Sequence, residues 1–161
     1  MRLAVVAAFL ALAVLPSQAA AAAPLVPRGI QIQFIRLLFV RDDLAYVPTV
    51  APPGYPFQGD QVNQDGLEID FGPAPKKGEL IGQQNIFTFN VQYFKGNLAN
   101  CVSGNELTLH IGKAKVYTGG NTAWRCLTSV HGKLLKMTVT GVGFSRVALG
   151  KIVASGTHVT E

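Results

Sequence analysis

Apolar and polar residues alternate along much of the chain, and this pattern is typical of strands that have one buried face. The clearest case is 67–71, where Leu, Ile and Phe alternate with Glu and Asp. The same period of two runs through 80–94 and through 106–117, where Gly112 marks an expected bulge or bend. These segments predict antiparallel strands with one face on the core and the other in water.

Apolar segments near the two ends of the chain are also predicted as strands. Segment 30–40 alternates at first and then becomes apolar except for Arg36, so it predicts a first strand that ends buried on both faces. A second apolar run follows at 44–50. In 127–159, short β-branched runs are separated by glycines, which predicts a β-meander. No segment predicts a helix of about ten residues or more.

The connecting segments are rich in glycine and proline and predict turns and loops. Segment 51–66 holds several prolines, so we expect it to be irregular. Short strands with frequent turn signals predict an all-β fold. We expect a closed antiparallel β-barrel of about eight strands, because polar groups within apolar runs would line a cavity. The alternative is a β-sandwich.

Residues 1–23 have the organisation of a secretory signal peptide. Arg2 precedes an apolar run at 3–15, and small residues place the expected cleavage after Ala19 or a few residues later. The run is shorter than the roughly 20 residues that span a bilayer, so we expect no membrane anchor. We therefore expect a secreted, extracellular protein in which 24–161 form a single domain.

Cys101 and Cys126 are the cysteines of the chain. In an oxidising compartment they are expected to form an intramolecular disulfide, which would add about 3 kcal/mol of stability. The alternatives are two buried thiols or a bridge between chains. We expect no metal site, because neither cysteine has the close spacing to a second ligand that zinc sites use.

Charge is unevenly distributed along the chain, whose formal net charge is +5. Acidic residues are concentrated before Lys95, and lysine and arginine predominate after it. The basic half would attract a cell-surface polyanion such as an acidic polysaccharide, or it forms the solvated outer face of the barrel. Nucleic acid is not expected, because the chain has no basic cluster or exposed aromatic motif of the kind that binds it.

No catalytic motif in the sequence is strong. Glu68 and Asp70 share one strand face, either as an acid–base pair or as solvated acids beside buried neighbours. Asp42 and Asp43 end the most apolar segment, as turn caps or inside a cavity. A carboxylate in a partly apolar cavity has a raised pKa and can exchange a proton with a phenol or an enol. Arg36 either lines this cavity or reaches the surface.

Three segments carry a family resemblance. Segment 37–44 runs apolar and aromatic into Arg41 and two aspartates, and segment 80–89 has Gly-Gln-Gln followed by aromatic residues. Segment 137–144 is a short glycine-containing strand that ends in phenylalanine. Together they resemble the dirigent proteins, secreted relatives of the allene oxide cyclase barrel, in which a histidine stands in place of Arg41 and an arginine in place of Gln83.

The resemblance implies a barrel that is often trimeric and works without a cofactor. Its members bind phenoxy radicals made by a separate oxidase and steer their stereoselective coupling, or they carry out a cyclisation. Asp42 is the matching acid and the expected proton donor or acceptor. We expect the small aromatic or apolar ligand to contact Arg36, Asp43, Tyr46, Gln83 and Phe87.

Two other functions are consistent with the same sequence. The first is a non-catalytic binding or effector module that recognises a cell-surface glycan or protein through the basic half of the chain. The second is a lipocalin-like carrier. Salt-sensitive adhesion to polyanions would favour the binding module, and a ligand that copurifies would favour the carrier.

Overall fold

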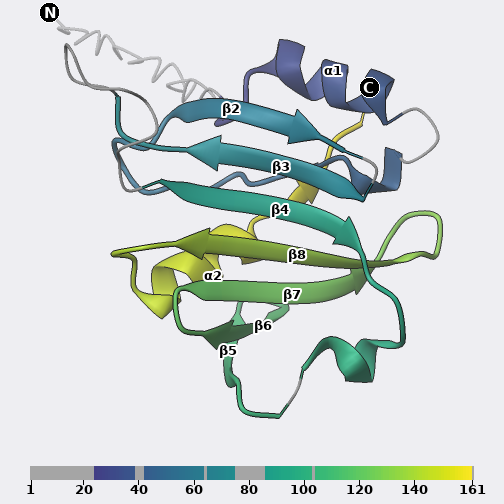
Figure 1. Ribbon diagram of the computed structural model, residues 1–161, viewed down its shortest axis with the longest axis vertical. Helices are drawn as coiled ribbons and strands as arrows, with labels where there is room; N and C mark the ends of the chain where they lie inside the picture. The colour runs from purple at the N-terminus through teal and green to yellow at the C-terminus, as the bar shows by residue number, and fades with distance from the viewer. Residues whose placement is uncertain (1–23, 39–41, 64, 75–85, 103, 161) are drawn as a thin grey trace, which may run out of the picture.

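The computed structural model describes residues 24–38, 42–63, 65–74, 86–102 and 104–160, and most of the regular structure in these ranges is β (Figure 1). The strands of the main sheet are β2 (Phe57–Val62), β3 (Gly66–Phe71), β4 (Phe87–Tyr93), β5 (Leu107–Ile111), β6 (Ala114–Gly119), β7 (Thr122–Thr128) and β8 (Leu134–Gly141). They pair antiparallel in the order β2-β3-β4-β8-β7-β6-β5. Short strands β1 (Tyr46–Val47) and β9 (Thr157–His158) form a separate antiparallel ribbon.

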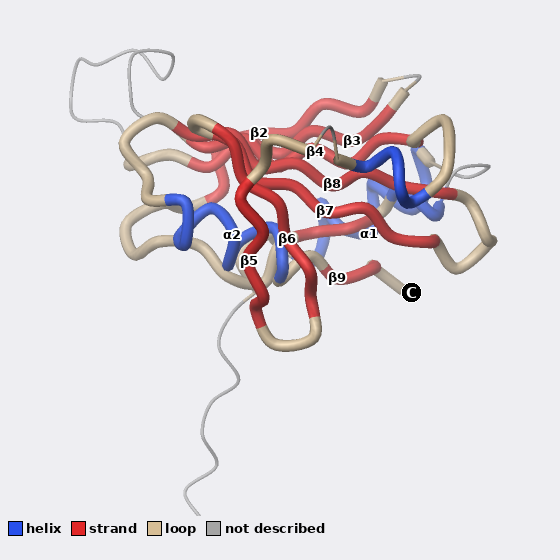
Figure 2. The backbone as a smooth tube through the Cα atoms, turned by 90° about the horizontal axis from the view of Figure 1, so that it is seen from below, coloured by secondary structure: helices blue, strands red, loops and turns tan. Residues whose placement is uncertain are grey.

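The helices lie with the β1–β9 ribbon on one side of the sheet (Figure 2). They are α1 (Arg28–Leu37) and α2 (Arg146–Ala154), and two 3-10 turns, η1 (Asp42–Leu44) and η3 (Leu98–Cys101), complete the described elements. The hydrophobic core fills the space between this layer and the sheet. Ile69, Phe89 and Val139 stand in one cross-strand row of the inner face, and none has exposed surface. The opposite side of the sheet bears no α-helix among the described residues, and its side chains are half-buried or exposed.

The predicted β class is confirmed, and so are three of the predicted strand regions. β3 and β4 lie in 67–71 and 80–94 apart from one residue, whereas 106–117, predicted as one strand bent at Gly112, holds β5 and most of β6 as the two strands of a hairpin. Gly112 has a φ of +58°, a conformation that suits glycine, in the turn of that hairpin. The closed barrel is not observed, because β2 and β5 each pair with a single neighbour in the described part of the chain.

The predicted first strand is wrong, and the predicted meander is confirmed only in part, since β8 and β9 lie in 127–159 with α2 between them. Segment 30–40 lies largely in α1, whose buried residues Gln31 and Phe34, together with buried Leu38 just after it, are spaced three and four residues apart. Residues 30–34 alternate between apolar and polar, so the segment resembles a strand although its buried residues have helical spacing. The second half of the predicted meander contains α2, which begins after Ser145, where the Ser145 hydroxyl accepts a hydrogen bond from the Ala148 N–H (3.1 Å).

The predicted loop at 51–66 is also partly wrong, because the whole of β2 lies within it. β2 pairs with β3 along one side only, with a register shift between Phe57 and Gly59. The prolines of the loop precede the strand, so they remove no donor from its ladder. The expected signal peptide at 1–23 lies outside the described residues. No helix in the described ranges is both long and apolar enough to cross a bilayer.

Candidate functional site

The residues predicted to contact a ligand occupy different environments. Arg36 is exposed on α1, whereas Phe87 is fully buried. The Phe87 ring stacks on Phe71, with centroids 4.8 Å apart and planes 9° from parallel. Phe87 is therefore part of the core packing. Gln83 lies outside the described residues, and Asp42 begins η1 with a side chain that is also outside them.

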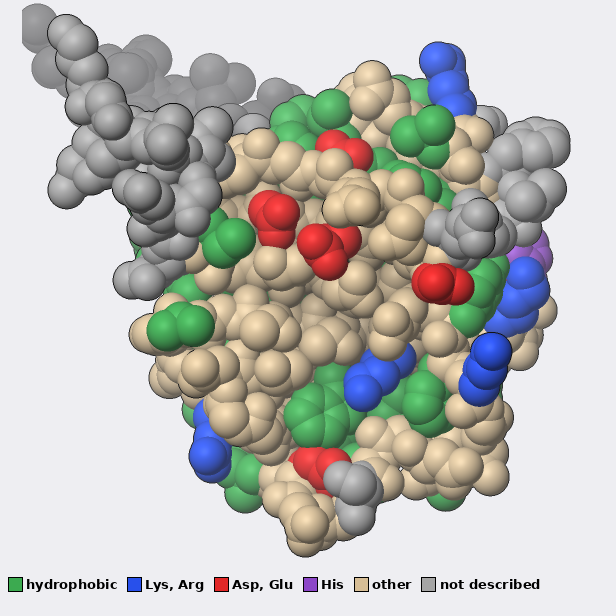
Figure 3. Space-filling view, viewed as in Figure 1, with side chains coloured by type: hydrophobic (Ala, Val, Ile, Leu, Met, Phe, Trp, Pro, Cys, Tyr) green, Lys and Arg blue, Asp and Glu red, His purple; other side chains and the backbone are tan. Residues whose placement is uncertain are grey.

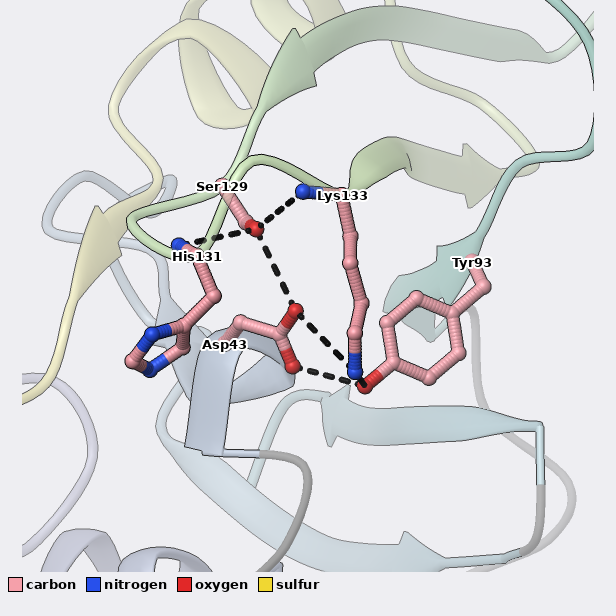
Figure 4. Close-up of polar contacts among 5 residues, drawn as sticks. All are labelled: Asp43, Tyr93, Ser129, His131 and Lys133. Atoms are coloured by element: carbon pink, nitrogen blue, oxygen red, sulfur yellow. Dashed lines mark hydrogen bonds and ion pairs between the residues drawn. The ribbon is translucent and has the colours of Figure 1, made fainter.

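Asp43 is the buried centre of a polar cluster, which we call the Asp43 cluster (Figure 4). Its side chain is 1% exposed. The Tyr93 hydroxyl donates a hydrogen bond to one carboxylate oxygen (2.6 Å), and the Ser129 hydroxyl donates to the other (3.2 Å). Lys133 Nζ lies 3.9 Å from the second oxygen and 3.3 Å from the Tyr93 hydroxyl oxygen. The cluster thus joins η1, the end of β4 and the turn between β7 and β8.

The turn between β7 and β8 positions the hydroxyl of Ser129. Its oxygen accepts the backbone N–H groups of His131 (3.3 Å) and Lys133 (3.0 Å). The turn is further closed by Gly132, whose φ is +77° and whose N–H donates to the Ser129 carbonyl (3.0 Å). With its lone pairs occupied by these amides, the Ser129 hydroxyl directs its proton towards Asp43.

The Asp43 cluster brings a carboxylate, a phenol, a hydroxyl and an ammonium group together. The buried carboxylate is satisfied by two hydroxyl donors and one cation, as a buried charge must be. Lys133 is 51% exposed, so it links the carboxylate and the Tyr93 phenol to solvent. A carboxylate in contact with a phenol is the pairing that the sequence suggested for a ligand, but here the phenol belongs to the protein.

Arg125 lies on the inner face of the sheet, in register with buried Met137. One terminal nitrogen donates to the Gly156 carbonyl (2.7 Å), while Nε is buried and has no hydrogen-bond partner among the described residues. Burial lowers the pKa of Arg125, and the nearby Tyr46 phenol opposes this effect. Sequence reasoning missed Arg125, although the alternation of β7 places it on the same face as buried Ala123.

Tyr46, one of the predicted ligand contacts, is buried in the β1–β9 ribbon. Its ring meets the His158 ring edge-on, with centroids 5.1 Å apart. Burial raises the pKa of the Tyr46 phenol above its ordinary 10.0, Arg125 opposes this shift, and Asp43 adds to it. The folded protein therefore holds the phenolic proton more tightly than the unfolded chain does.

This difference predicts a loss of stability in alkali. Because the unfolded chain releases the Tyr46 proton at its ordinary pKa, the free energy of unfolding should fall as the pH rises through 10.0 and above. Replacing Tyr46 by phenylalanine should remove this part of the fall. Urea unfolding between about pH 8 and about pH 11 measures it. Identical pH dependence in the variant and the wild type would contradict the assignment to Tyr46.

The face of the sheet without an α-helix, which we call the helix-free face, carries a second group of polar and aromatic side chains. Glu68, Asn90, Thr138, Trp124 and Tyr117 stand opposite one another on five adjacent strands, and we call this set the cross-strand row. Figure 3 shows acidic side chains gathered over β2 and β3, and hydrophobic and basic ones over β7 and β8. The row therefore runs from a carboxylate through an amide and a hydroxyl to two aromatic rings.

Lysines flank the aromatic end of the row. The Trp124 and Tyr117 rings have centroids 6.2 Å apart. Lys136 Nζ lies 5.2 Å from the Trp124 ring centroid, and Lys115 Nζ lies 5.4 Å from the Tyr117 centroid. These contacts are cation–π interactions on a solvent-facing surface. The aromatic end is consequently the basic end of the face.

The predicted disulfide is confirmed, and it orients Trp124. Cys101 and Cys126 are bonded at an S–S distance of 2.04 Å, which joins η3 to β7. The Trp124 indole N–H donates to the Cys101 carbonyl (2.9 Å). On the neighbouring strand a Cβ added to Gly119 would stand 3.6 Å from the ring, an ordinary van der Waals contact. The hydrogen bond to Cys101 is therefore the contact that orients the indole.

Comparison with protein-family models, curated proteins and solved structures found no match to this chain. The similarity to dirigent proteins therefore depends on the sequence segments alone. The Asp43 cluster and the cross-strand row were not predicted as groups, because each assembles residues from strands and turns that are distant in sequence. Strand alternation alone would have placed Trp124 and Lys136 on one face.

Proposed function

We propose that the protein is an extracellular binding module that holds an acidic glycan on the helix-free face of its sheet. The observation that carries this proposal is the cross-strand row, in which hydrogen-bonding side chains lead to an adjacent pair of aromatic rings. Sugar rings stack their C–H faces on aromatic side chains, and their hydroxyls bond to amides, carboxylates and hydroxyls. Adjacent strands lie about 4.8 Å apart, so successive side chains meet successive parts of a sugar chain.

Charge selects an acidic glycan over a neutral one. Lys136 and Lys115 stand at the aromatic end, where they would pair with sugar carboxylates. Glu68 stands at the other end and would accept hydrogen bonds from sugar hydroxyls. In the free protein Lys136 lies over the indole, and its flexible side chain would swing aside when a sugar stacks there. The expected signal peptide at 1–23 and the Cys101–Cys126 bridge support an extracellular location.

Removing the indole should weaken glycan binding. We expect Trp124→Ala to lower affinity for polygalacturonate about tenfold, because it removes the stacking surface. Trp124→Phe should retain part of the affinity. Isothermal titration calorimetry at two salt concentrations measures both effects, and near-ultraviolet circular dichroism checks the fold.

The lysines provide the matched comparison for this experiment. The double variant Lys115→Ala/Lys136→Ala should bind polygalacturonate more weakly and with less salt dependence than the wild type. Lys95→Ala removes an exposed lysine away from the row and should behave as the wild type does. If Trp124→Ala and the double lysine variant both bind with wild-type affinity, or if the wild type does not bind, the proposal is wrong.

A second candidate function is supported by the contact between Asp43 and a phenol. As in dirigent proteins, the chain would position phenoxy radicals made by a separate oxidase, or guide a cyclisation, with Asp42 or Asp43 as the proton-handling acid. This candidate requires a lined cavity, as in a closed and often trimeric barrel. Chiral analysis of the products of a propenyl phenol and a one-electron oxidant tests it. An excess of one enantiomer over the protein-free control would support it, and a racemic product would exclude it for that substrate.

A further inference from the structure

An apolar groove runs along the solvent side of α2, in the layer opposite the cross-strand row. It consists of two adjoining cavities of about 290 and 250 Å³, which share Val50 and Lys151. Val50 and Pro52 form one wall, and Ile111 in the hairpin of β5 and β6 forms the other. The groove contributes to neither of the sites described above.

The floor of the groove is one face of α2. Ala148, Lys151, Ile152 and Ser155 are spaced three, four and seven residues from the first, so they line up along the helix over about 10 Å. Small side chains at Ala148 and Ser155 leave the space open. The two cavities therefore follow one another along the helix, an arrangement that suits a linear hydrocarbon chain.

The walls of the groove are held in place in the free protein. The Ser155 hydroxyl accepts the backbone N–H groups of Thr49 and Val50, both at 3.1 Å, and so ties one wall to the end of α2. At the other wall α2 packs closely on the sheet, since a Cβ added to Gly150 would lie 2.9 Å from Ile111 Cδ1. A ligand would thus enter a site that is already formed.

Lys151 supplies the only charged side chain among the described residues that line the groove. No acidic side chain stands among these lining residues, and the Lys151 ammonium group makes no hydrogen bond or ion pair within the described part of the chain. An unpaired cation beside an apolar channel matches an anion that carries an apolar tail. We propose that this groove binds a free fatty acid, with its hydrocarbon chain along α2 and its carboxylate at Lys151.

The dependence of affinity on chain length and on head-group charge distinguishes this proposal from non-specific hydrophobic binding. Decanoate, octanoate and decanol would be titrated into the full chain labelled with ¹⁵N, and the amide resonances followed. Decanoate should shift the amides of Val50, Lys151 and Ser155. Octanoate should bind about fourfold more weakly than decanoate. It lacks two methylenes, and in an open groove each methylene contributes roughly half the free energy of a fully buried one.

Variants test the two ends of the ligand. Lys151→Met should weaken decanoate about fivefold and leave decanol unchanged, as expected for one exposed ion pair. Val50→Asp, at a position that is 47% exposed, should weaken both ligands without disturbing the core. The matched control Lys95→Met should bind decanoate as the wild type does.

Any one of four results would overturn the proposal. The first three are equal affinity of Val50→Asp and the wild type for decanoate, amide shifts on β7 and β8 in place of α2, and no dependence on chain length. Binding to anionic phospholipid vesicles without binding to decanoate would likewise exclude a free fatty acid as the ligand. Glycan binding plays no part in these measurements, so the two proposals stand or fall separately.

Discussion

Replacing Phe87 by alanine should lower the free energy of unfolding by about 4 kcal/mol. Phe87 has no exposed surface, stacks on Phe71 and meets the Phe144 ring edge-on at a centroid distance of 5.7 Å. The substitution removes a full aromatic side chain and leaves a cavity that these neighbours cannot fill. Urea unfolding followed by circular dichroism measures the loss.

The neighbouring residue supplies the control for this experiment. Ile86 is 37% exposed, so Ile86→Ala should cost less than about 1 kcal/mol. The result also decides between two roles for Phe87. If Phe87→Ala kept wild-type stability but lost ligand binding, the original prediction of a ligand contact would be restored and its place in the core rejected.

Replacing Asp43 by alanine should destabilise the protein by about 3 kcal/mol. The change leaves the buried hydroxyl of Ser129 and that of Tyr93 without their shared acceptor, and Lys133 without its counter-charge. It also disconnects η1 from the turn between β7 and β8. Asp43→Asn, which keeps the shape and one acceptor oxygen, should cost about half as much.

A double-mutant cycle isolates the phenol–carboxylate bond within this effect. We expect Asp43→Ala and Tyr93→Phe to be coupled by about 1 kcal/mol or more, because the two residues are in direct contact. Asp65→Ala removes an exposed acid and should change stability by less than about 0.5 kcal/mol. Additive effects of the two cluster variants would show that the Asp43 cluster does not act as a unit.

The two proposed binding sites use the two layers of the fold differently. The cross-strand row exists because antiparallel strands place alternate residues on a face that no described α-helix covers. The groove exists because α2 lies over the sheet and leaves one side of itself in solvent. Since they share no residue, variants at one site are controls for the other.

The sequence by itself determined the central strands, the disulfide and the charge asymmetry. β3 and β4 were predictable because strict apolar–polar alternation over several residues fits a half-buried strand and does not fit the 3.6-residue period of a helix. The Cys101–Cys126 pair followed from the number of cysteines and the expected compartment. These features depend on residues that are close in sequence or few in number.

Only the tertiary structure decided the helices, the sheet edges and the sites. Segment 30–40 alternates like a strand, but it lies largely in α1 because Phe34 and Leu38 reach the core together on one helical face. The Ser145 cap was a readable signal for α2, yet the glycines after it favoured a meander. Asp43 meets Ser129 across 86 residues of chain, and no local pattern specifies such a contact. The contact forms because packing of the helix layer on the sheet brings η1 close to the turn between β7 and β8. A carboxylate buried there must be paired, and Ser129 is a donor within reach.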